Sequence, residues 1–389
     1  MKFFHLSDLH FGKQLHGYDL VGEQRKVIQD IIGAAKQEQP DAIVVAGDIY
    51  DRSVPSGSAM TLLEELFLGI DELGIELLVI AGNHDSAPRL RYGSTFLQRH
   101  HIHIAVFPPM EADERIQKVT LKDGQGAVNF YLLPYTNAGM LRSLAGEEKL
   151  DSADDAVRFL LGREEIDWSE RNVLVSHQFY LHNGKEPEQC DSESPRLYVG
   201  GLDAVNTATV EQFDYVALGH IHSPQNLGSS RIRYCGTPYP YSVSEAGQKK
   251  SISVVEIGGK DEISIRYIPL EPYRKLCCFR GTLEEIVSMA GEAGGGHDYV
   301  SITLTDEEPQ DAPKDYLERY FDHILEVRID NLRSKKMFAE EIQDMQEMTP
   351  CEAFEAFFAD TTGRGMSEKE KTVLIDILEE LLDGESKNL

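Results

Sequence analysis

The chain has little positive charge. Its 389 residues include 38 lysines and arginines against 66 aspartates and glutamates, a formal net charge of −28. Because so acidic a surface repels a polyanion at long range, general electrostatic attraction is not expected to hold nucleic acid on this chain. Binding of DNA would require metal ions, a few placed arginines or a basic partner.

Cysteine is scarce, and long hydrophobic runs are absent. The five cysteines form no CxxC pair and leave an odd one over, which argues against a disulfide framework and fits a reducing compartment. No apolar run is long enough to cross a bilayer, and the start MKFFHLSDLH becomes charged too early for a signal peptide. We therefore expect a cytoplasmic protein that is not inserted in a membrane.

Short apolar runs that end in polar motifs recur up to about residue 270. Examples are KFFHL, DAIVVAG, ELLVIAG, NVLVSH and YVALGH. Near-continuous Val/Ile/Leu runs indicate strands covered on both faces, and amphipathic helical segments separate several of them. The pattern predicts an α/β domain over residues 1–270.

Two further regions follow this domain. Residues 271–335 alternate strand, helix, strand, helix and strand, which predicts a small α/β unit. Residues 336–389 contain two amphipathic helical stretches, one of them rich in phenylalanine. These helices either pack on the chain itself or dock another protein, and the sequence does not decide between the two.

Five polar motifs, SDLH, GD, GNHD, SH and GHIH, each follow a strand-like run. Together they supply seven candidate ligands: Asp8, His10, Asp48, Asn83, His177, His220 and His222. Carboxylate, amide and imidazole without thiolate are typical of a metal site with nitrogen and oxygen ligands. Strand ends are also where open α/β sheets bind their ligands. Seven ligands are too many for one ion, so the pattern favours two ions that share a carboxylate.

Two HxH patterns occur, and they are interpreted differently. His220 and His222 follow a buried strand, and residues i and i+2 of an extended chain point the same way. They are therefore expected to face the metal site together. His101 and His103 precede a strand instead, and we interpret them as ordinary surface or core residues.

The motifs HLSDLHFG, AGDIYD, AGNHDS, ALGHIH and YCGTPYPYS, spread over residues 5–241, resemble those of the calcineurin-like metallophosphoesterases. The motif sequences are most similar to those of the SbcD subfamily of bacterial nuclease subunits. The resemblance implies a β-sandwich flanked by helices for the first domain. It further implies that residues 271–335 form a capping domain and that residues 336–389 form partner-docking helices.

The resemblance also implies a ligand set for two divalent ions. One ion would be held by Asp8, His10, Asp48 and His222, and the other by Asp48, Asn83, His177 and His220. Members of the family favour Mn²⁺. Because a pair of ions can activate water and clamp a phosphate, no protein nucleophile is needed.

Residues next to these motifs are candidates for catalysis and for phosphate binding. His84 would stabilise the pentavalent phosphorus or protonate the leaving oxygen, and Asp85 would orient it. Arg52 lies in GDIYDRS, which is similar to the GDxxDRG of protein phosphatases, whereas those phosphatases read GNHE where this chain reads GNHD. Arg89 and Arg91 are candidates for contacts to DNA phosphates, with a solvated loop as the alternative.

The function implied is that of a DNA nuclease subunit in repair, recombination and replication. It would act as a 3′→5′ exonuclease on duplex ends and as an endonuclease on hairpins and single strands. Its partner would be an SbcC-type coiled-coil ATPase, with a homodimer inside a heterotetramer. A metallophosphatase or small-molecule phosphodiesterase on the same fold is the alternative. A non-catalytic scaffold is disfavoured because every ligand position is intact.

Overall fold

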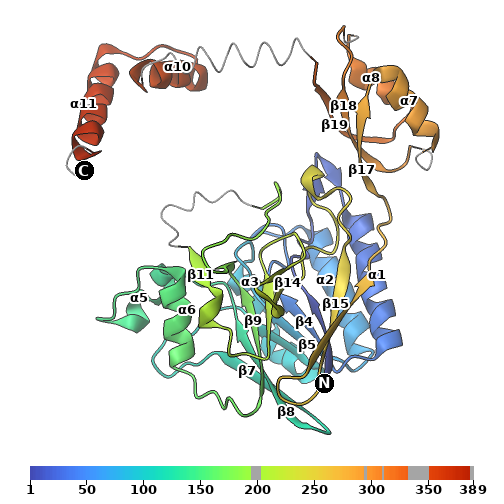
Figure 1. The fold of residues 1–389 in the computed structure, drawn as a ribbon, viewed down its shortest axis with the longest axis vertical. Helices are drawn as coiled ribbons and strands as arrows, with labels where there is room; N and C mark the ends of the chain where they lie inside the picture. Colours follow the sequence, from blue (N-terminus) through green and yellow to red (C-terminus); the bar gives the residue numbers. More distant parts are fainter. Residues whose placement is uncertain (194–202, 293–295, 309–310, 332–349, 386–389) are drawn as a thin grey trace. The chain divides into compact units, whose positions relative to one another are not determined.

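The computed structural model describes residues 1–193, 203–292, 296–308, 311–331 and 350–385 (Figure 1). Within those residues the chain divides into two units. The first comprises residues 1–193, 203–278, 296–301 and 321–326, and the second comprises residues 279–292, 302–308, 311–320, 327–331 and 350–385. The three-domain division given above stays a prediction, and its residues 336–349 lie outside the described part.

The first unit is built on two six-stranded sheets. The first sheet has the order β16-β15-β1-β4-β5-β6. Its strands are β1 (Lys2–Leu6), β4 (Ala42–Ala46), β5 (Glu76–Ile80), β6 (Ile102–Ala105), β15 (Ser251–Ile257) and β16 (Ile263–Pro269). Strands β1, β4, β5 and β6 run parallel, and the hairpin β15–β16 joins β1 antiparallel.

The second sheet has the order β13-β14-β12-β9-β8-β7. Its strands are β7 (Gln117–Asp123), β8 (Gly126–Leu133), β9 (Arg171–His177), β12 (Tyr215–Gly219), β13 (Gln225–Leu227) and β14 (Ser229–Tyr234). The four central strands β8, β9, β12 and β14 are parallel, and β7 and β13 are antiparallel edges.

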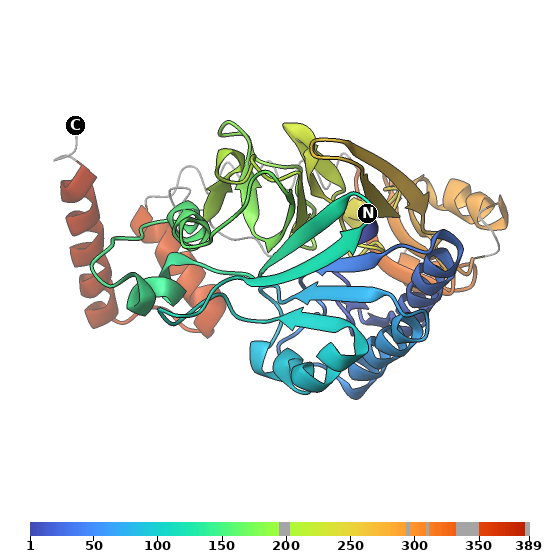
Figure 2. The same cartoon turned by 90° about the horizontal axis from the view of Figure 1, so that it is seen from below.

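Helices cover the outer face of each sheet (Figures 1 and 2). Helices α1 (Val21–Glu38) and α2 (Gly57–Asp71) share a hydrophobic core with the first sheet. Helices α5 (Ala138–Ala145) and α6 (Ala153–Gly162) share another core with the second sheet. A third core, which includes Phe3, Val44, Phe130 and Val175, fills the space between the sheets. The predicted β-sandwich flanked by helices is therefore confirmed.

The sequence explains this layering. Strand β4, AIVVA, is buried at every position, as expected for a strand that is covered on both faces. Helix α1 buries Val27, Ile28, Ile31 and Ala35, a stripe at three- and four-residue spacing. Burial of each larger aliphatic side chain contributes about 1.5–3 kcal/mol, so this stripe holds α1 on the sheet.

Short elements complete the first unit. They are β2 (Gln14–Leu15), β3 (Tyr18–Asp19), α3 (Ala87–Arg91), α4 (Ser94–Leu97), β10 (Phe179–Leu181) and β11 (Ala204–Asn206). Strands β10 and β11 form a small parallel pair, and β2 pairs with β3. Among the described residues of this unit, short 3₁₀ turns also occur at Gln98–His100, Thr207–Thr209 and Val243–Glu245.

A small α/β region follows the sandwich, as the sequence predicts. Its sheet has the order β17-β18-β19. The region contains β17 (Leu276–Gly281), α7 (Leu283–Glu292), β18 (Tyr299–Leu304), α8 (Pro313–Leu317) and β19 (His323–Ile329). Helices α10 (Pro350–Thr362) and α11 (Glu368–Glu385) come next. None of the described helices is both long and apolar enough to cross a membrane.

Candidate metal centre

The seven predicted ligands meet at one edge of the sandwich. Asp8 and His10 follow β1, Asp48 follows β4, and Asn83 follows β5. From the other sheet, His177 ends β9, and β12 leads into His220 and His222. The register pairs Leu6 with Val45 and His177 with Gly219, so the carboxyl ends of these parallel strands lie side by side.

One carboxylate oxygen forms the middle of the cluster. Asp48 Oδ2 lies 3.4 Å from His177 Nε2, 3.7 Å from His10 Nε2 and 3.9 Å from His84 Nε2. The other oxygen, Oδ1, accepts a hydrogen bond from the backbone amide of His84 at 2.9 Å. Asp48 is therefore fixed by one oxygen and presents the other to three imidazoles.

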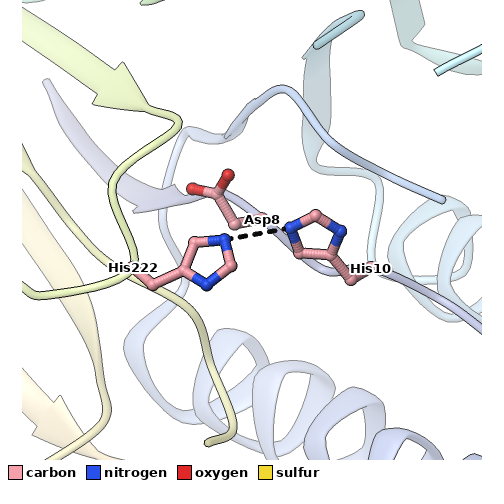
Figure 3. A group of neighbouring side chains, drawn as sticks. All are labelled: Asp8, His10 and His222. Carbon is pink, nitrogen blue, oxygen red and sulfur yellow. Dashed lines mark hydrogen bonds between the residues drawn. The ribbon is translucent and has the colours of Figure 1, made fainter. Parts of the chain in front are cut away.

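Asp8, His10 and His222 make up one side of the cluster (Figure 3). Each offers a ligand atom within 4.8 Å of those of the other two, and all three side chains are buried. The Nε2 atoms of His10 and His222 lie 3.2 Å apart. Two imidazole nitrogens and a carboxylate that converge in this way match the ligands of a divalent cation.

Asn83 joins the remaining ligands on the other side. Its Oδ1 lies 2.9 Å from His220 Nδ1 and 3.1 Å from His177 Nε2. His177 also belongs, with Asp8 and Asp48, to a buried group whose ligand atoms lie within 4.8 Å of one another. The structure thus brings all seven predicted side chains together, in two sets that meet at Asp48.

The protonation of His177 tests whether this set fits a cation. Its Nδ1 lies 2.8 Å from the carbonyl oxygen of Ala46, which can only accept, so Nδ1 carries the proton. In the neutral ring, the lone pair of Nε2 then faces two further acceptors, Asn83 Oδ1 and Asp48 Oδ2. Three acceptors at this spacing need a positive charge among them, which either a proton on Nε2 or a divalent cation supplies.

The electrostatics of the cluster agree with this fit. Burial raises the pKa of Asp48, but the surrounding imidazoles, His177 above all, outweigh burial and hold that pKa well below its ordinary range. Burial lowers the pKa of His177, yet Asp48 raises it more strongly, to about 9. Without a cation, His177 therefore holds a proton that a metal ion must displace. Burial also keeps the pKa of His10 well below its ordinary value, which leaves a neutral ring.

The backbone is strained at four of the predicted ligands. Asp8, His10, Asp48 and His220 have φ values of 53°, 43°, 50° and 103°. Positive φ is uncommon for residues other than glycine and costs of order 1–3 kcal/mol, and such residues cluster at functional sites. Because this strain lowers stability, we infer that these four positions are kept for function.

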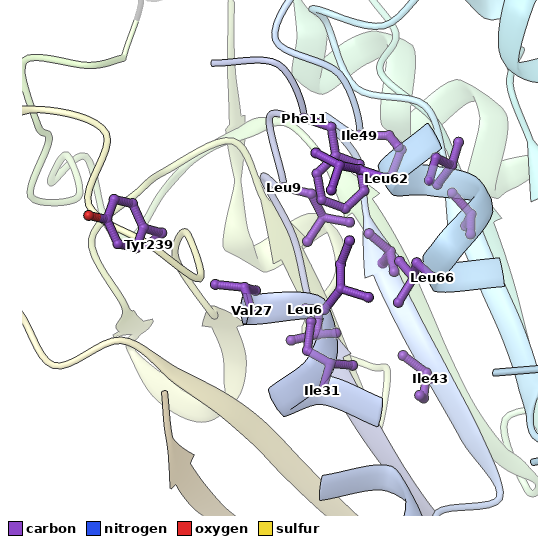
Figure 4. Close-up of a cluster of buried hydrophobic side chains, with 14 of the residues drawn as sticks. Leu6, Leu9, Phe11, Val27, Ile31, Ile43, Ile49, Leu62, Leu66 and Tyr239 are labelled. Carbon is purple, nitrogen blue, oxygen red and sulfur yellow. The ribbon is translucent and has the colours of Figure 1, made fainter. Parts of the chain in front are cut away.

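Burial of neighbouring apolar side chains compensates for the strained backbone at Asp8 and His10. Leu9 and Phe11 alternate with Asp8 and His10, and both are buried in the core that includes Leu62 (Figure 4). The alternation sends the apolar side chains toward α2 and leaves the polar ones to the cluster. The buried Leu9 and Phe11 of SDLHF thus hold the adjacent Asp8 and His10 in position.

Two glycines permit close approach around the cluster. A Cβ on Gly82 would lie 2.1 Å from Asp48 Oδ1, and a Cβ on Gly219 would lie 1.9 Å from the carbonyl oxygen of Ala46. Any side chain there would collide with a ligand or with the strand beside it. This explains glycine before the ligand residue in GNHD and in GHIH.

Comparisons with known proteins agree with this geometry. Residues 1–224 match the family model described as calcineurin-like phosphoesterase. The chain is 30% identical, over 390 aligned positions that cover 100% of both chains, to the SbcD subunit of the nuclease SbcCD of Staphylococcus saprophyticus. The chain belongs to the SbcD family of calcineurin-like metallophosphoesterases.

Further matches extend the likeness beyond the metal centre. Residues 272–362 match the SbcD_C model, described as type 5 capsule protein repressor C-terminal domain. The SbcD subunit of the nuclease SbcCD of Staphylococcus epidermidis is 29% identical over 99% of this chain and 100% of its own length. The solved structure of TT1561 of Thermus thermophilus aligns with 68% of this chain and 98% of its own, at 10% identity and a TM-score of 0.40. That last likeness is too distant to support any statement about function.

His84, the predicted catalytic residue of this metallophosphoesterase, lies beside the cluster with its side chain 25% exposed. Its Nδ1 lies 3.0 Å from the carbonyl oxygen of Asp51, and its Nε2 faces Asp48. His84, His10 and Asp48 also offer ligand atoms within 4.8 Å of one another, so geometry alone would allow His84 to bind a cation. The His84 side chain is partly exposed, whereas those of His10 and Asp48 are buried, and its catalytic role stays a prediction.

Asp85 fastens the neighbouring loops. Its carboxylate accepts hydrogen bonds from the backbone amides of Ile49, Tyr50 and Gly82 at 2.9–3.1 Å. Burial, followed by the charge of Asp48, raises the pKa of Asp85 to about 6. The contact that orients the His84 ring comes from Asp51, and a catalytic role for Asp85 stays a prediction.

The three predicted phosphate-binding arginines differ in their surroundings. Arg89 Nη1 donates to the carbonyl oxygen of Ser53 at 2.7 Å, so it ties its own loop to the loop after Asp48. The side chain of Arg52 is 76% exposed, and its Nε lies 3.5 Å from Asp51 Oδ2. Arg91 is exposed. All three roles in phosphate binding remain predictions.

Sequence reasoning passed over Lys13. Its Nζ lies 2.9 Å from Asp51 Oδ1, and the same carboxylate oxygen is 3.9 Å from His10 Nδ1. A positive charge therefore stands next to the cluster. The signal was present in SDLHFGK, where a lysine follows His10 in a chain with few cations. His101 and His103, in contrast, both contact Glu76 at the amino ends of the strands, away from the cluster.

Proposed function

We propose that this chain is the nuclease subunit of a two-subunit DNA repair enzyme and that its cluster holds two Mn²⁺ ions. The proposal depends mainly on Asp48 Oδ2, which lies 3.4 Å from His177 Nε2 and 3.7 Å from His10 Nε2, one imidazole from each ligand set. One ion would be held by Asp8, His10, Asp48 and His222, and the other by Asp48, Asn83, His177 and His220. Carboxylate, amide and imidazole ligands suit Mn²⁺.

Two divalent ions, when bound, activate water and neutralise charge on a phosphodiester. The residues of this chain orient the ligands and provide a proton donor. Asp48 would serve both ions with one carboxylate, and the Ala46 carbonyl holds the His177 ring with its Nε2 toward the centre. In the protonated form of His84, Nδ1–H is held by the Asp51 carbonyl, and Nε2–H is available for the leaving oxygen.

Full-length similarity to nuclease subunits supports DNA as the substrate. We propose 3′→5′ exonuclease action on duplex ends and endonuclease action on hairpins and single strands, in the cytoplasm, for repair, recombination and replication. The net charge of −28 requires help with DNA binding, which an SbcC-type coiled-coil ATPase would provide. We expect two nuclease chains and two ATPase chains in the assembly.

The C-terminal helices are the proposed docking site for that ATPase. On α10, Phe354 and Phe357 are 44% and 63% exposed, and on α11, Val373 and Ile377 are 58% and 50% exposed. Large apolar side chains exposed together on helices are typical of a surface that another protein covers.

A phosphatase is the second candidate, because of Arg52. In the motif GDIYDRS this arginine is exposed one position after Asp51, and arginine binds phosphate well. The same fold and metals serve both activities, so the substrate has to be tested directly.

The test is cleavage of end-labelled duplex and hairpin DNA by the purified chain in Mn²⁺, Mg²⁺ or EDTA, with and without the ATPase partner and ATP. Two p-nitrophenyl phosphate esters, a monoester and a diester, are assayed alongside. We expect Mn²⁺-dependent DNA cleavage that is lost in His84→Ala and kept in His101→Ala, the matched histidine outside the cluster. Rapid monoester hydrolysis with intact DNA, even with the partner present, would contradict a nuclease and favour the phosphatase.

A further inference from the structure

The segment after YCGTPYPYS has no part in the function described so far, yet it lies against the metal centre. Its Glu245 is fully buried, 0% exposed. One carboxylate oxygen, Oε2, receives Lys250 Nζ at 2.6 Å and Thr237 Oγ1 at 2.8 Å. The other, Oε1, receives the backbone amide of Tyr241 at 3.1 Å. A buried ion pair with this many hydrogen bonds is fixed in place.

A serine from a distant loop connects Glu245 to the metal centre. Ser192 Oγ lies 2.6 Å from Glu245 Oε1 and 2.6 Å from His222 Nδ1. Glu245 Oε1 and His222 Nδ1 are themselves 3.7 Å apart. The hydroxyl of Ser192 therefore links a buried carboxylate to the ring of a proposed ligand.

The direction of the two hydrogen bonds follows from what each group can do. The carboxylate of Glu245, paired with Lys250, only accepts, so the hydroxyl of Ser192 gives its single proton to Glu245. The oxygen of Ser192 must then accept from His222, which places a proton on Nδ1. In a neutral ring the lone pair is consequently on Nε2, the nitrogen that faces His10 Nε2 at 3.2 Å.

The backbone of His222 is held by the same neighbourhood. Its amide donates to Glu193 Oε1 at 2.8 Å, and its carbonyl accepts from Lys250 Nζ at 3.2 Å. The ring and the main chain of His222 are thus fixed from two segments, 190–193 and 242–250, which themselves meet where the Asp191 amide donates to Ser244 Oγ at 2.8 Å.

We propose that Ser192 and Glu245 are positioning residues that hold His222 in the Nδ1–H tautomer and so direct its Nε2 lone pair at a cation. The inference rests on the proposed function, since it assumes that His222 binds one ion of a pair. The segment after YCGTPYPYS then has a function: its Glu245 supplies the carboxylate that accepts the last hydrogen bond in the series His222–Ser192–Glu245. Such outer hydrogen bonds orient metal-binding histidines and raise their basicity.

The test is Mn²⁺ binding by the full chain, with the free ion counted from its six-line electron paramagnetic resonance signal and the affinities measured by titration calorimetry. Ser192→Ala removes the hydroxyl, and Ser192→Thr keeps it. Ser244→Ala is the matched control, because it removes a serine hydroxyl that docks the same loop without touching His222. Circular dichroism before metal addition establishes that each variant is folded.

We expect wild type to bind two ions and Ser192→Ala to bind one of them about 10–100-fold more weakly, the usual cost of losing such a hydrogen bond. Ser192→Thr and Ser244→Ala should stay close to wild type. Two ions in wild type with unchanged affinity in Ser192→Ala, or equal weakening in Ser244→Ala, would overturn the inference alone. Fewer than two ions in wild type would overturn the proposed function, and the inference with it.

Discussion

His10 and His222 face each other with their Nε2 atoms 3.2 Å apart, although 212 positions separate them in the sequence. Burial holds the pKa of His10 well below its ordinary value, so its ring is neutral. His10 Nδ1 is also buried and, among the described residues, lacks a hydrogen-bond partner. The two facing Nε2 atoms either share one proton or, with both lone pairs directed inward, bind a cation between them. The protein therefore keeps a preformed site for positive charge.

Metal binding should stabilise the fold. If Mn²⁺ binds only the native state, a concentration 100 times the dissociation constant adds about 2.7 kcal/mol to the free energy of unfolding. We predict a higher melting temperature in Mn²⁺ than in EDTA, measured by calorimetry. Asp48→Asn should abolish the increase, because it removes the carboxylate that both ligand sets share. An increase of equal size in that variant would mean that Mn²⁺ binds elsewhere.

His84→Ala should separate catalysis from metal binding. Loss of a general acid lowers the rate by about 10²–10⁴-fold, and the seven proposed ligands are untouched. The predicted outcome is a large fall in kcat for DNA cleavage with two Mn²⁺ ions still bound, counted by titration. If the variant also loses an ion, then His84 is a ligand, as its place 3.9 Å from Asp48 would allow.

Gly82→Ala should damage the centre by sterics alone. The new Cβ would lie 2.1 Å from Asp48 Oδ1 and 2.4 Å from the Asp48 backbone nitrogen, and overpacking of this kind costs about 1–3 kcal/mol. We predict a lower melting temperature and weaker Mn²⁺ binding. The control is Gly33→Ala in α1, where a Cβ meets nothing within 4 Å; it should gain about 0.5–1 kcal/mol from helix propensity. Unchanged metal binding in Gly82→Ala would contradict the close approach of Gly82 to Asp48.

The acid stability of the sandwich should depend on Asp123. Its carboxylate accepts from Arg171 Nη2 and from the Met1 amine, both at 2.6 Å, and Arg171 is the main reason that the pKa of Asp123 lies well below its ordinary value of 3.8. The depressed pKa contributes stability above about pH 5 that is lost as the pH falls through the native pKa. Hydrogen bonds between charged groups contribute about 1.5–3 kcal/mol each, so Asp123→Asn should lower the unfolding free energy by about 2 kcal/mol at pH 7.

Urea unfolding at several pH values measures this contribution. The gap between wild type and Asp123→Asn should narrow as the pH falls from neutrality toward the native pKa of Asp123. Asp113→Asn, at an exposed position, should match wild type throughout. A gap that stays constant with pH would show that the ion pairs of Asp123 are not its source.

Local patterns were enough to predict an α/β domain and the seven candidate ligands, whereas the sandwich was implied by the family resemblance. Strands such as AIVVA are buried on both faces, and each ends directly before a polar motif, so parallel strands bring SDLH, GD and GNHD to one edge. The i and i+2 pattern also placed His220 and His222 in one cluster, although β12 ends at Gly219 and His220 has a φ of 103°, so the chain there is not an extended strand. Each of these features lies within a few residues of sequence.

Contacts between segments that are distant in the sequence could not be predicted from such local patterns. Ser192 and Glu245 are 53 positions apart, and nothing in either segment signals that they meet. The Asp51 carbonyl that orients His84 is a backbone atom, which sequence motifs do not identify. The positive φ angles of Asp8 and Asp48 arise from packing around them, since intrinsic preference disfavours them.

The most direct test of the central claim is diffraction from crystals grown in Mn²⁺, with data collected on both sides of the manganese absorption edge. We predict two anomalous peaks in the cluster, both adjacent to the carboxylate of Asp48. One peak should also adjoin His10 and His222, and the other Asn83, His177 and His220. A single peak, or two peaks of which only one adjoins Asp48, would contradict a dinuclear centre bridged by that residue.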